Sequence, residues 1–425
     1  MWRNHPTESY SNYSGISSSL SSSTYSNFSS QTKWQRISNK SMSREINHSS
    51  VCRPYRVPLM EDDSTDRDYT TAQSIVGTCP IMCPEKERIQ REGLRDLAIF
   101  ERLNGNPRKS SSSLAVKKFC RTISLKEIQA SDLRPLSVLE DTLDHLMKLL
   151  ESSDHSFLLL HDFIFDRIRS IRQDISMQNI NNDQVICMYQ KMVRFYVTSH
   201  HKLRRCEGDS TTLSSIHHLN MEQLTKCLGS LYNLYDMNRN FESIFDNEAE
   251  FRSLYVLLHL DSQSNSAGES LSLWFSRLSS FIISSKEMCF ARTVLRSFRM
   301  GNFWRFFHTI ASESTYMQFC IIEPFILEVR AHALACINSS GYKLHPYPLR
   351  TLSNILMIGE LDLESFCNAS GLQTSHDDVG NKVLPTKQTG FSHPKGGFQC
   401  NVFSWLELLK KDVRQSEFSS ASDSC

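Results

Sequence analysis

Two cysteines are the first residues in this chain whose type and spacing suggest chemistry. Cys79 and Cys83 lie four positions apart in GTCPIMCPEKERIQRE, directly before Pro84 and a run of charges. Structural zinc takes four ligands, usually as two close pairs, and a redox dithiol is typically Cys-x-x-Cys beside a βαβ unit. No second pair follows, and Cys120 has no histidine beside it. We interpret the two thiols as packing residues at a helix start, with a metal site and a redox pair as the alternatives.

The other reactive residue types do not combine into a catalytic site. The histidine pairs His200-His201 and His217-His218 lack the spacing of metal ligands. The sequence contains neither a glycine-rich phosphate loop nor a nucleophile elbow. We therefore expect no catalytic residue, no metal and no cofactor, and predict that the protein is not an enzyme.

A second concentration of charge is the arginine run in DRIRSIRQD. Arg169 and Arg172 are three positions apart and so share one helical face, with Arg167 to one side of them. The favoured interpretation is a solvated or ion-paired face, because Asp166 and Asp174 partly neutralise it. The alternatives are phosphate binding and a structural role in which arginine bridges carbonyls or carboxylates between helices.

Basic residues near aromatic side chains also occur toward the C-terminal end of the chain. Such a combination suits sequence-independent binding of single-stranded nucleic acid, through phosphate contacts and stacking. The candidate nucleic-acid-binding residues are Lys343, Arg350, Lys382, Lys387 and Lys395.

The elements that position these residues are helices, because apolar residues recur at helical spacing from residue 84 onward. Pro84 and the acids after it predict a helix start, followed by Ile89 and Leu94 at helical spacing. Salt bridges from Glu87 to Arg91 and from Arg88 to Glu92 are expected on this helix. Further helices are predicted over 136–150, 157–175, 185–203, 224–235, 251–258, 270–282, 286–299, 302–312 and 316–337. The pattern indicates an all-α array of helical hairpins, an α-solenoid.

The pattern changes after residue 341. Two short helices, in HPYPLRTLSNILMI and GELDLESFCNASGLQTS, precede expected strands around NKVLPTKQ and GFQCNVFSW, an order typical of a winged-helix unit with a small β-ribbon. We expect one apolar face of this unit to pack on itself and on a partner protein. The candidate partner-interface residues are Leu349, Leu352, Leu356 and Phe366.

Composition divides the chain into four parts. Residues 1–72 are rich in serine and are predicted to be disordered; an organelle transit peptide is the alternative, because Glu8 is the only acid among the first 44 residues. The predicted helical domain covers 73–340, the winged-helix unit 341–415 and a disordered tail 416–425. Thirteen scattered cysteines indicate a reducing compartment, and the net charge of +1 gives no global attraction to nucleic acid. No apolar run is long enough to span a membrane.

Several ordered motifs resemble those of the Sac-three/GANP family. GTCPIMCPEKERIQRE resembles its opening motif, Gly-x-Cys-x-x-Met-Cys-Pro-x-x-Glu closing on Arg-Glu. AVKKFCRTIS, DLRPLSVLEDTLDHLMKLL, FIFDRIRSIRQDISMQ and FRMGNFWRFF resemble later family segments in the same order, with Phe119 and Thr122 as departures. The resemblance covers roughly residues 75 to 370 and is nearest to short, plant-type members. The family-motif positions, interpreted as structural, are Cys79, Cys83, Pro84, Glu87, Arg91, Glu92, Arg167, Arg169, Arg172 and Asp174.

This resemblance implies a PCI-like architecture and a function. Family scaffolds organise nuclear TREX-type assemblies that couple transcription to mRNA export. They pair through the winged helix with a PCI-domain protein that carries a small acidic Sem/Dss-type subunit, and the paired units bind RNA. The expected location is the nucleus, near its pores.

The sequence also departs from large family members. It has no Phe-Gly repeats before the core and no long helix after it, so binding of centrin and Sus/ENY-type subunits is not expected. Nor does it have an acetyltransferase region. Short animal members of similar length have been linked to centrosome and spindle organisation, which gives the alternative function and a cytoplasmic or centrosomal location.

Overall fold

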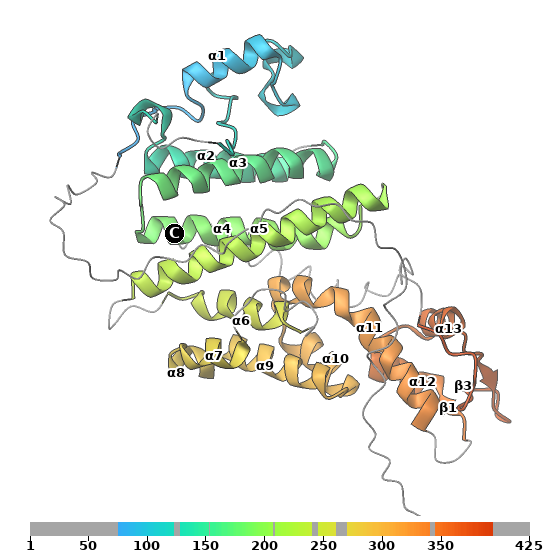
Figure 1. Ribbon diagram of the computed structural model, residues 1–425. Coiled ribbons are helices and arrows are strands. Elements are labelled where there is room, and N and C mark those ends of the chain that lie inside the picture. Colours follow the sequence, from blue (N-terminus) through green and yellow to red (C-terminus); the bar gives the residue numbers. More distant parts are fainter. Residues whose placement is uncertain are drawn as a thin grey trace, which may run out of the picture. The chain divides into compact units, whose positions relative to one another are not determined.

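The computed structural model describes residues 75–122, 128–152, 154–206, 209–239, 245–260, 270–340 and 345–393, all within the unit that runs from Thr70 to Cys425. The predicted tails at 1–72 and 416–425 and the strand expected in GFQCNVFSW lie outside the described residues, as do Lys343 and Lys395. The described part is a succession of helices followed by a small sheet (Figure 1). The predicted fold class, an all-α array with a small β element, is confirmed.

The first helix, α1 (Glu85–Leu94), begins where the sequence predicts, because Pro84 caps it in a non-helical conformation and Glu85 and Glu87 occupy its first turn. Its orientation differs from the one that apolar spacing predicts. Ile89 and Leu94 are 56% and 69% exposed, and Arg91 is the buried residue of this helix. Short 3-10 turns follow at Ile99–Glu101 (η1), Leu103–Gly105 (η2) and Ala130–Asp132 (η3).

Four long helices then form two consecutive pairs. The first pair is α2 (Leu136–Ser152) with α3 (Phe157–Met177), and the second is α4 (Asp183–Leu203) with α5 (Ser210–Met237). The α3 and α4 helices are in contact, which joins the pairs (Figure 1). Side-chain caps fix two of the starts: Asn182 accepts from the Val185 amide at 3.1 Å, and Asp209 from the Thr212 amide at 3.0 Å.

Shorter helices follow: α6 (Glu248–Leu258), α7 (Leu271–Ser276), α8 (Ser280–Ser284), α9 (Lys286–Arg299) and α10 (Phe303–Glu313). The single helix predicted over 270–282 is wrong. The chain breaks at Arg277, and the Ser279 side chain caps a new helix by accepting from the Ile282 amide. The predictions for α9 and α10 are confirmed to within one residue.

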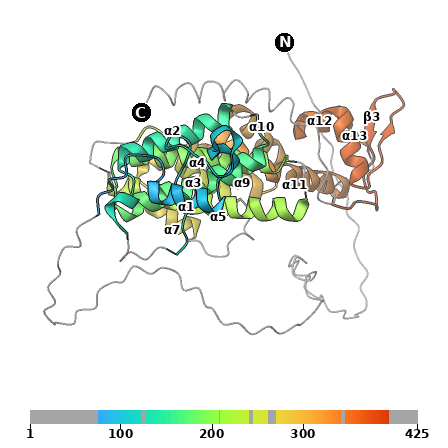
Figure 2. The ribbon, with the colours of Figure 1, turned by 90° about the horizontal axis from the view of Figure 1, so that it is seen from above.

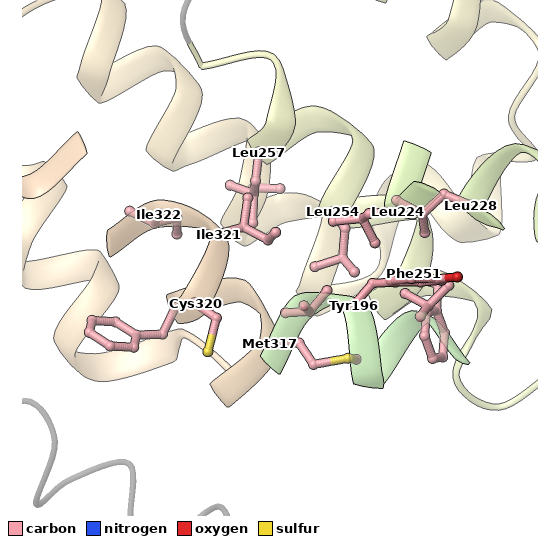
Figure 3. Close-up of a cluster of buried hydrophobic side chains, with 14 of the residues drawn as sticks. Tyr196, Leu224, Leu228, Phe251, Leu254, Leu257, Met317, Cys320, Ile321 and Ile322 are labelled. Carbon is pink, nitrogen blue, oxygen red and sulfur yellow. The ribbon is translucent and has the colours of Figure 1, made fainter. Parts of the chain in front are cut away.

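The long helix α11 (Tyr316–Ser340) returns against α4 and α6 and closes the main core. Figure 3 shows this meeting point, where Tyr196 of α4, Leu228 of α5 and Leu254 of α6 belong to one buried cluster with Met317 and Ile321 of α11. These side chains are at most 3% exposed. Burial of large apolar residues from four helices is the main stabilising contribution here, at about 1.5–3 kcal/mol for each fully buried side chain.

The last described unit follows α11 and combines two short helices with a sheet. It contains β1 (Tyr347–Pro348), α12 (Leu349–Leu356), α13 (Glu360–Ala369), β2 (Ser375–His376) and β3 (Lys382–Leu384). The strands are antiparallel in the order β1-β3-β2, with Tyr347 opposite Leu384 and Ser375 opposite Val383. Figure 2 shows α12, α13 and β3 grouped beside the end of α11. For residues 345–393 we keep, as a label, the name winged-helix unit from the prediction for 341–415.

Within the described segments, no helix has the length and apolar character needed to cross a membrane.

Candidate functional site: a buried charge network and the winged-helix unit

The opening motif is anchored by backbone contacts to the segment before α2. The Cys79 amide donates to the Leu133 carbonyl at 2.9 Å, and the Thr78 amide donates to the Ala130 carbonyl at 2.8 Å. Gly77 has no room for a side chain, since a Cβ there would lie 2.6 Å from the Leu133 oxygen. The glycine of the motif is therefore required for close approach of two backbones.

The two cysteines are buried packing residues, at 3% and 1% exposure for Cys79 and Cys83. Burial raises the pKa of both thiols, that of Cys83 to about 12. Because the thiolate is the form that binds metals and attacks disulfides, neither side chain is prepared for such chemistry. Among the described residues, no group of three or more His, Cys, Asp or Glu is placed to hold a metal ion.

A carboxylate that the sequence did not single out is the centre of the first half of the network. Glu101 is 0% exposed, and its Oε2 accepts from Arg91 and, at 3.0 Å, from Arg167. The amides of Ala98 and Val116 donate to the two Glu101 oxygens, each at 3.0 Å. Two arginines that are 76 positions apart in sequence therefore meet on one buried acid, which holds α1 on α3.

Asp174 of α3 is the centre of the second half. Its Oδ1 accepts from Lys117 Nζ at 2.7 Å, and its Oδ2 accepts from Arg134 Nε at 2.7 Å. Arg134 also donates to Ser170 Oγ at 2.9 Å and to the Met82 carbonyl at 3.3 Å. Every side chain in this ion-pair group is at least 90% buried, so the network fixes the motif segment and the segment before α2 on α3.

The remaining motif charges lie at the edge of this network. The expected pairs are present: Arg91 Nη1 lies 3.7 Å from Glu87 Oε1, and Arg88 Nη1 lies 2.9 Å from Glu92 Oε1. Glu87 and Glu92 additionally accept from the amides of Lys118 and Ser110, at 2.8 and 2.9 Å. These acids therefore tie α1 to the loop that follows it.

The arginine run of α3 divides between different roles. Arg167 is 3% exposed and paired with Glu101 and Asp166, so the ion-paired interpretation and the structural alternative both describe it, and only the solvated form is wrong. The guanidinium of Arg169 lies 3.8 Å from the centre of the Phe119 ring. Arg172 donates to Gln223 at 3.1 Å and lies over Tyr189. All three arginines contact neighbouring parts of the same chain.

Two side chains of α11 form hydrogen bonds with the winged-helix unit. Arg330, 1% exposed, donates to the carbonyls of Leu356 and Met357 at 3.1 and 2.6 Å, where α12 ends. Asn338 donates to the Gln388 carbonyl at 2.8 Å and accepts from the Gln388 amide at 2.9 Å. No sequence signal identified either residue, because both lie inside an apolar helix.

The residues predicted to offer a face to a partner are core residues instead. Leu349, Leu352, Leu356 and Phe366 are at most 1% exposed and pack within the chain. As a partner surface they are unsuitable, because their apolar atoms are already covered. Leu361 of α13 and Val379, in the turn between β2 and β3, are the large apolar side chains that this unit does expose, at 75% and 84%.

The described cations of the predicted nucleic-acid site are dispersed and mostly engaged. Lys382 Nζ pairs with Glu364 at 2.5 Å, and Lys387 Nζ donates to the Ser339 carbonyl at 2.8 Å. Arg350 is exposed on α12. The described residues therefore do not form a continuous basic surface at the wing.

Known proteins resemble this chain over most of its described residues. The family model of the SAC3/GANP family matches residues 82–376. The chain is 35% identical to SAC3 family protein B of Arabidopsis thaliana over 352 residues, which are 81% of this chain. It is 31% identical to SAC3 family protein 1 of Schizosaccharomyces pombe over 377 residues, which are 85% of this chain. Protein xmas of Drosophila melanogaster is 29% identical over 328 residues, or 74% of this chain. The chain spans only 20%, 36% and 15% of the lengths of these three relatives. Together with the family match, the identities and their coverage show that the chain belongs to the SAC3/GANP family.

Proposed function

We propose that this protein is a non-enzymatic scaffold of a TREX-type complex, which couples transcription and RNA processing to nuclear mRNA export. Its membership of the SAC3/GANP family supports the biological role. The structural observation behind the scaffold mechanism is the attachment of the winged-helix unit to α11 through Arg330 and Asn338. This attachment presents the winged-helix unit from a fixed base.

A rigid attachment favours assembly because less conformational freedom is lost on binding. The partner that we propose is a PCI-domain protein that carries a small acidic Sem/Dss-type subunit. Leu361 and Val379 would contact it, because they are the large apolar side chains that the winged-helix unit exposes and burial at an interface would remove them from water. RNA would then bind the assembled complex, which we place in the nucleus near its pores.

The direct test is reconstitution from purified components. The full chain is co-expressed with a PCI-domain protein and its acidic subunit from the same organism, and the mixture is separated by size-exclusion chromatography. We expect the three proteins to elute together at a stoichiometric ratio. Elution of the chain by itself, together with the absence of any PCI-domain protein from affinity-purified cell extract, would remove the support for this function.

Cell imaging separates the two locations that the family suggests. A nuclear or pore-adjacent signal of the tagged chain agrees with the export function. A signal at centrosomes or the spindle would instead favour the cytoskeletal function of short animal members.

A further inference from the structure

The outer face of α9 carries three arginines in a narrow stripe. Arg292, Arg296 and Arg299 are spaced by four and three residues, which places them on the same side of an α-helix over about 10 Å. All three are exposed, whereas the opposite face of α9 is buried. The buried side chains are Met288, Phe290, Ala291, Val294, Leu295 and Ser297.

This stripe is not neutralised by its surroundings. Buried arginines such as Arg91, Arg134 and Arg252 have a carboxylate partner, whereas none of the three stripe arginines forms an ion pair with a described residue. From α7 to the end of α10 there are six Lys and Arg residues and two acids, a net charge of +4, in a chain whose total is +1. Arg292 lies over the Phe275 ring at 5.9 Å, which positions it without a negative charge.

Helix stabilisation explains only part of the stripe. Arg296 and Arg299 lie in the last turn of α9, where cations favour the negative end of the helix dipole. Arg292 lies outside that turn and gains nothing comparable. The dipole also leaves the guanidinium groups in solvent, so it does not compete with a ligand for their hydrogen-bond donors.

An exposed aromatic pair lies at the end of the stripe. The turn Met300–Gly301–Asn302 connects α9 to α10, so Arg299 and Trp304 belong to the same end of this helix pair. Trp304 is 57% exposed, and its ring is stacked on His308 with centroids 5.0 Å apart and 7° between planes. Arg305, beside Trp304, is also exposed and forms no ion pair with a described residue.

We propose that the α9–α10 surface, comprising Arg292, Arg296, Arg299, Trp304 and Arg305, binds single-stranded RNA. The arginines contact successive phosphates, and the indole, held flat by His308, stacks on a base. The proposal rests on the proposed function for the identity of the nucleic acid and moves its binding surface away from the wing. A purely acidic protein partner would use the arginines but not a pre-stacked exposed indole.

Fluorescence anisotropy with a short labelled oligouridylate tests the charge contribution. The triple variant R292E/R296E/R299E should bind more weakly, and the slope of log affinity against log salt should decrease in magnitude by about 2, since three phosphate contacts are lost. The matched control is K86E/R108E/K109E, which changes the net charge equally at three exposed positions on and after α1. Equal loss in both variants, or no loss in either, would overturn the assignment.

The stacking contribution is tested separately with the intact arginines. Trp304→Ala should lower the affinity about tenfold, and Trp304→Phe should retain most of it. Polyglutamate that competes as well as unlabelled oligouridylate, with W304A at wild-type affinity, would identify an acidic partner and overturn the proposal.

Separate experiments can contradict the scaffold function and the RNA-binding surface on α9 and α10. The triple variant should still co-elute with the PCI-domain partner, because the stripe lies outside the winged-helix unit. RNA binding by the purified chain without any PCI partner would in turn preserve the surface assignment while the scaffold function failed.

Discussion

Arg134 and Asp174 form an ion pair from which solvent is excluded: Nε and Oδ2 are 2.7 Å apart, and both side chains are 0% exposed. Arg134 precedes α2, whereas Asp174 lies near the end of α3, and Lys117 adds a second cation to the same carboxylate. The desolvation of such charges is costly, so each partner depends on the others being present.

Replacing Asp174 by alanine should therefore destabilise the protein strongly. Arg134 and Lys117 would remain buried without a counter-charge, at a cost of about 3–5 kcal/mol. Thermal unfolding of the two proteins measures this cost. The control is Asp96→Ala, which removes an exposed pair with Lys118 and should cost about 0–1 kcal/mol. A D174A variant as stable as D96A would contradict the central role of the network.

The cysteines of the opening motif should be unreactive in the native protein. Burial excludes reagents and raises the pKa of Cys83 to about 12, so little thiolate exists at neutral pH. Brief treatment with iodoacetamide, followed by peptide mass spectrometry, should label Cys120 and Cys336, which are exposed, before Cys79 or Cys83. Rapid labelling of Cys83 would revive the metal or redox alternative.

The opening motif shows which structural features can be predicted from the sequence. The start of α1 and its surface salt bridges follow from local rules, and both are present. The inward direction of Arg91 is not local, because it depends on Glu101 and Arg167, which arrive from other segments. Helical periodicity identifies an apolar face, but α1 is held by charge and leaves Ile89 exposed. The helical spacing of apolar residues therefore does not reveal a buried charge network.

The winged-helix unit shows a second limit. Its helices were predictable from proline and leucine spacing, but β1 and β2 have two residues each, too few for an alternating pattern. The apolar spacing also identified Leu352 and Phe366 without indicating that they are covered by their own chain. Nor did sequence spacing reveal that Lys382 is paired with Glu364.

Arg330 should control the attachment of the winged-helix unit. In Arg330→Met, the carbonyls of Leu356 and Met357 lose donors worth about 1.5–3 kcal/mol each when the donor is charged. Hydrogen exchange should accelerate in α12 but not in α4. The control is His332→Gln on the same helix, whose side chain is 41% exposed. Unchanged protection of α12 in R330M would contradict the attachment.

Stability should fall on acidification because of buried and half-buried histidines of α3, α4 and α5. Burial and the nearby His217 lower the pKa of His200 to about 3, and burial also lowers the pKa values of His161 and His217. Below about pH 6.5 the unfolded chain binds protons that the folded chain does not, so their stabilising contribution is present above pH 6.5 and declines below it.

His200 by itself should account for about 2 kcal/mol of lost stability between pH 7 and pH 5. Chemical denaturation of the wild type and of His200→Gln across this range isolates the contribution. The variant loses the 2.7 Å contact with His217, so its stability at pH 7 is lower, but its dependence on pH should be shallower. Equal slopes for the two proteins would contradict the assignment.

The partner surface of the winged-helix unit is tested by placing charges on its exposed apolar residues. L361D/V379D should weaken binding of the PCI-domain protein by about 2 kcal/mol or more, since a charged side chain cannot be buried at the centre of an interface without cost. Both residues are mainly solvent-exposed, so the variant should unfold at the same temperature as the wild type. Leu159→Asp on α3, where the leucine is 52% exposed, is the control for a general effect of surface charge. Isothermal titration with the purified partner measures the difference, and wild-type affinity in L361D/V379D would place the interface elsewhere on the chain.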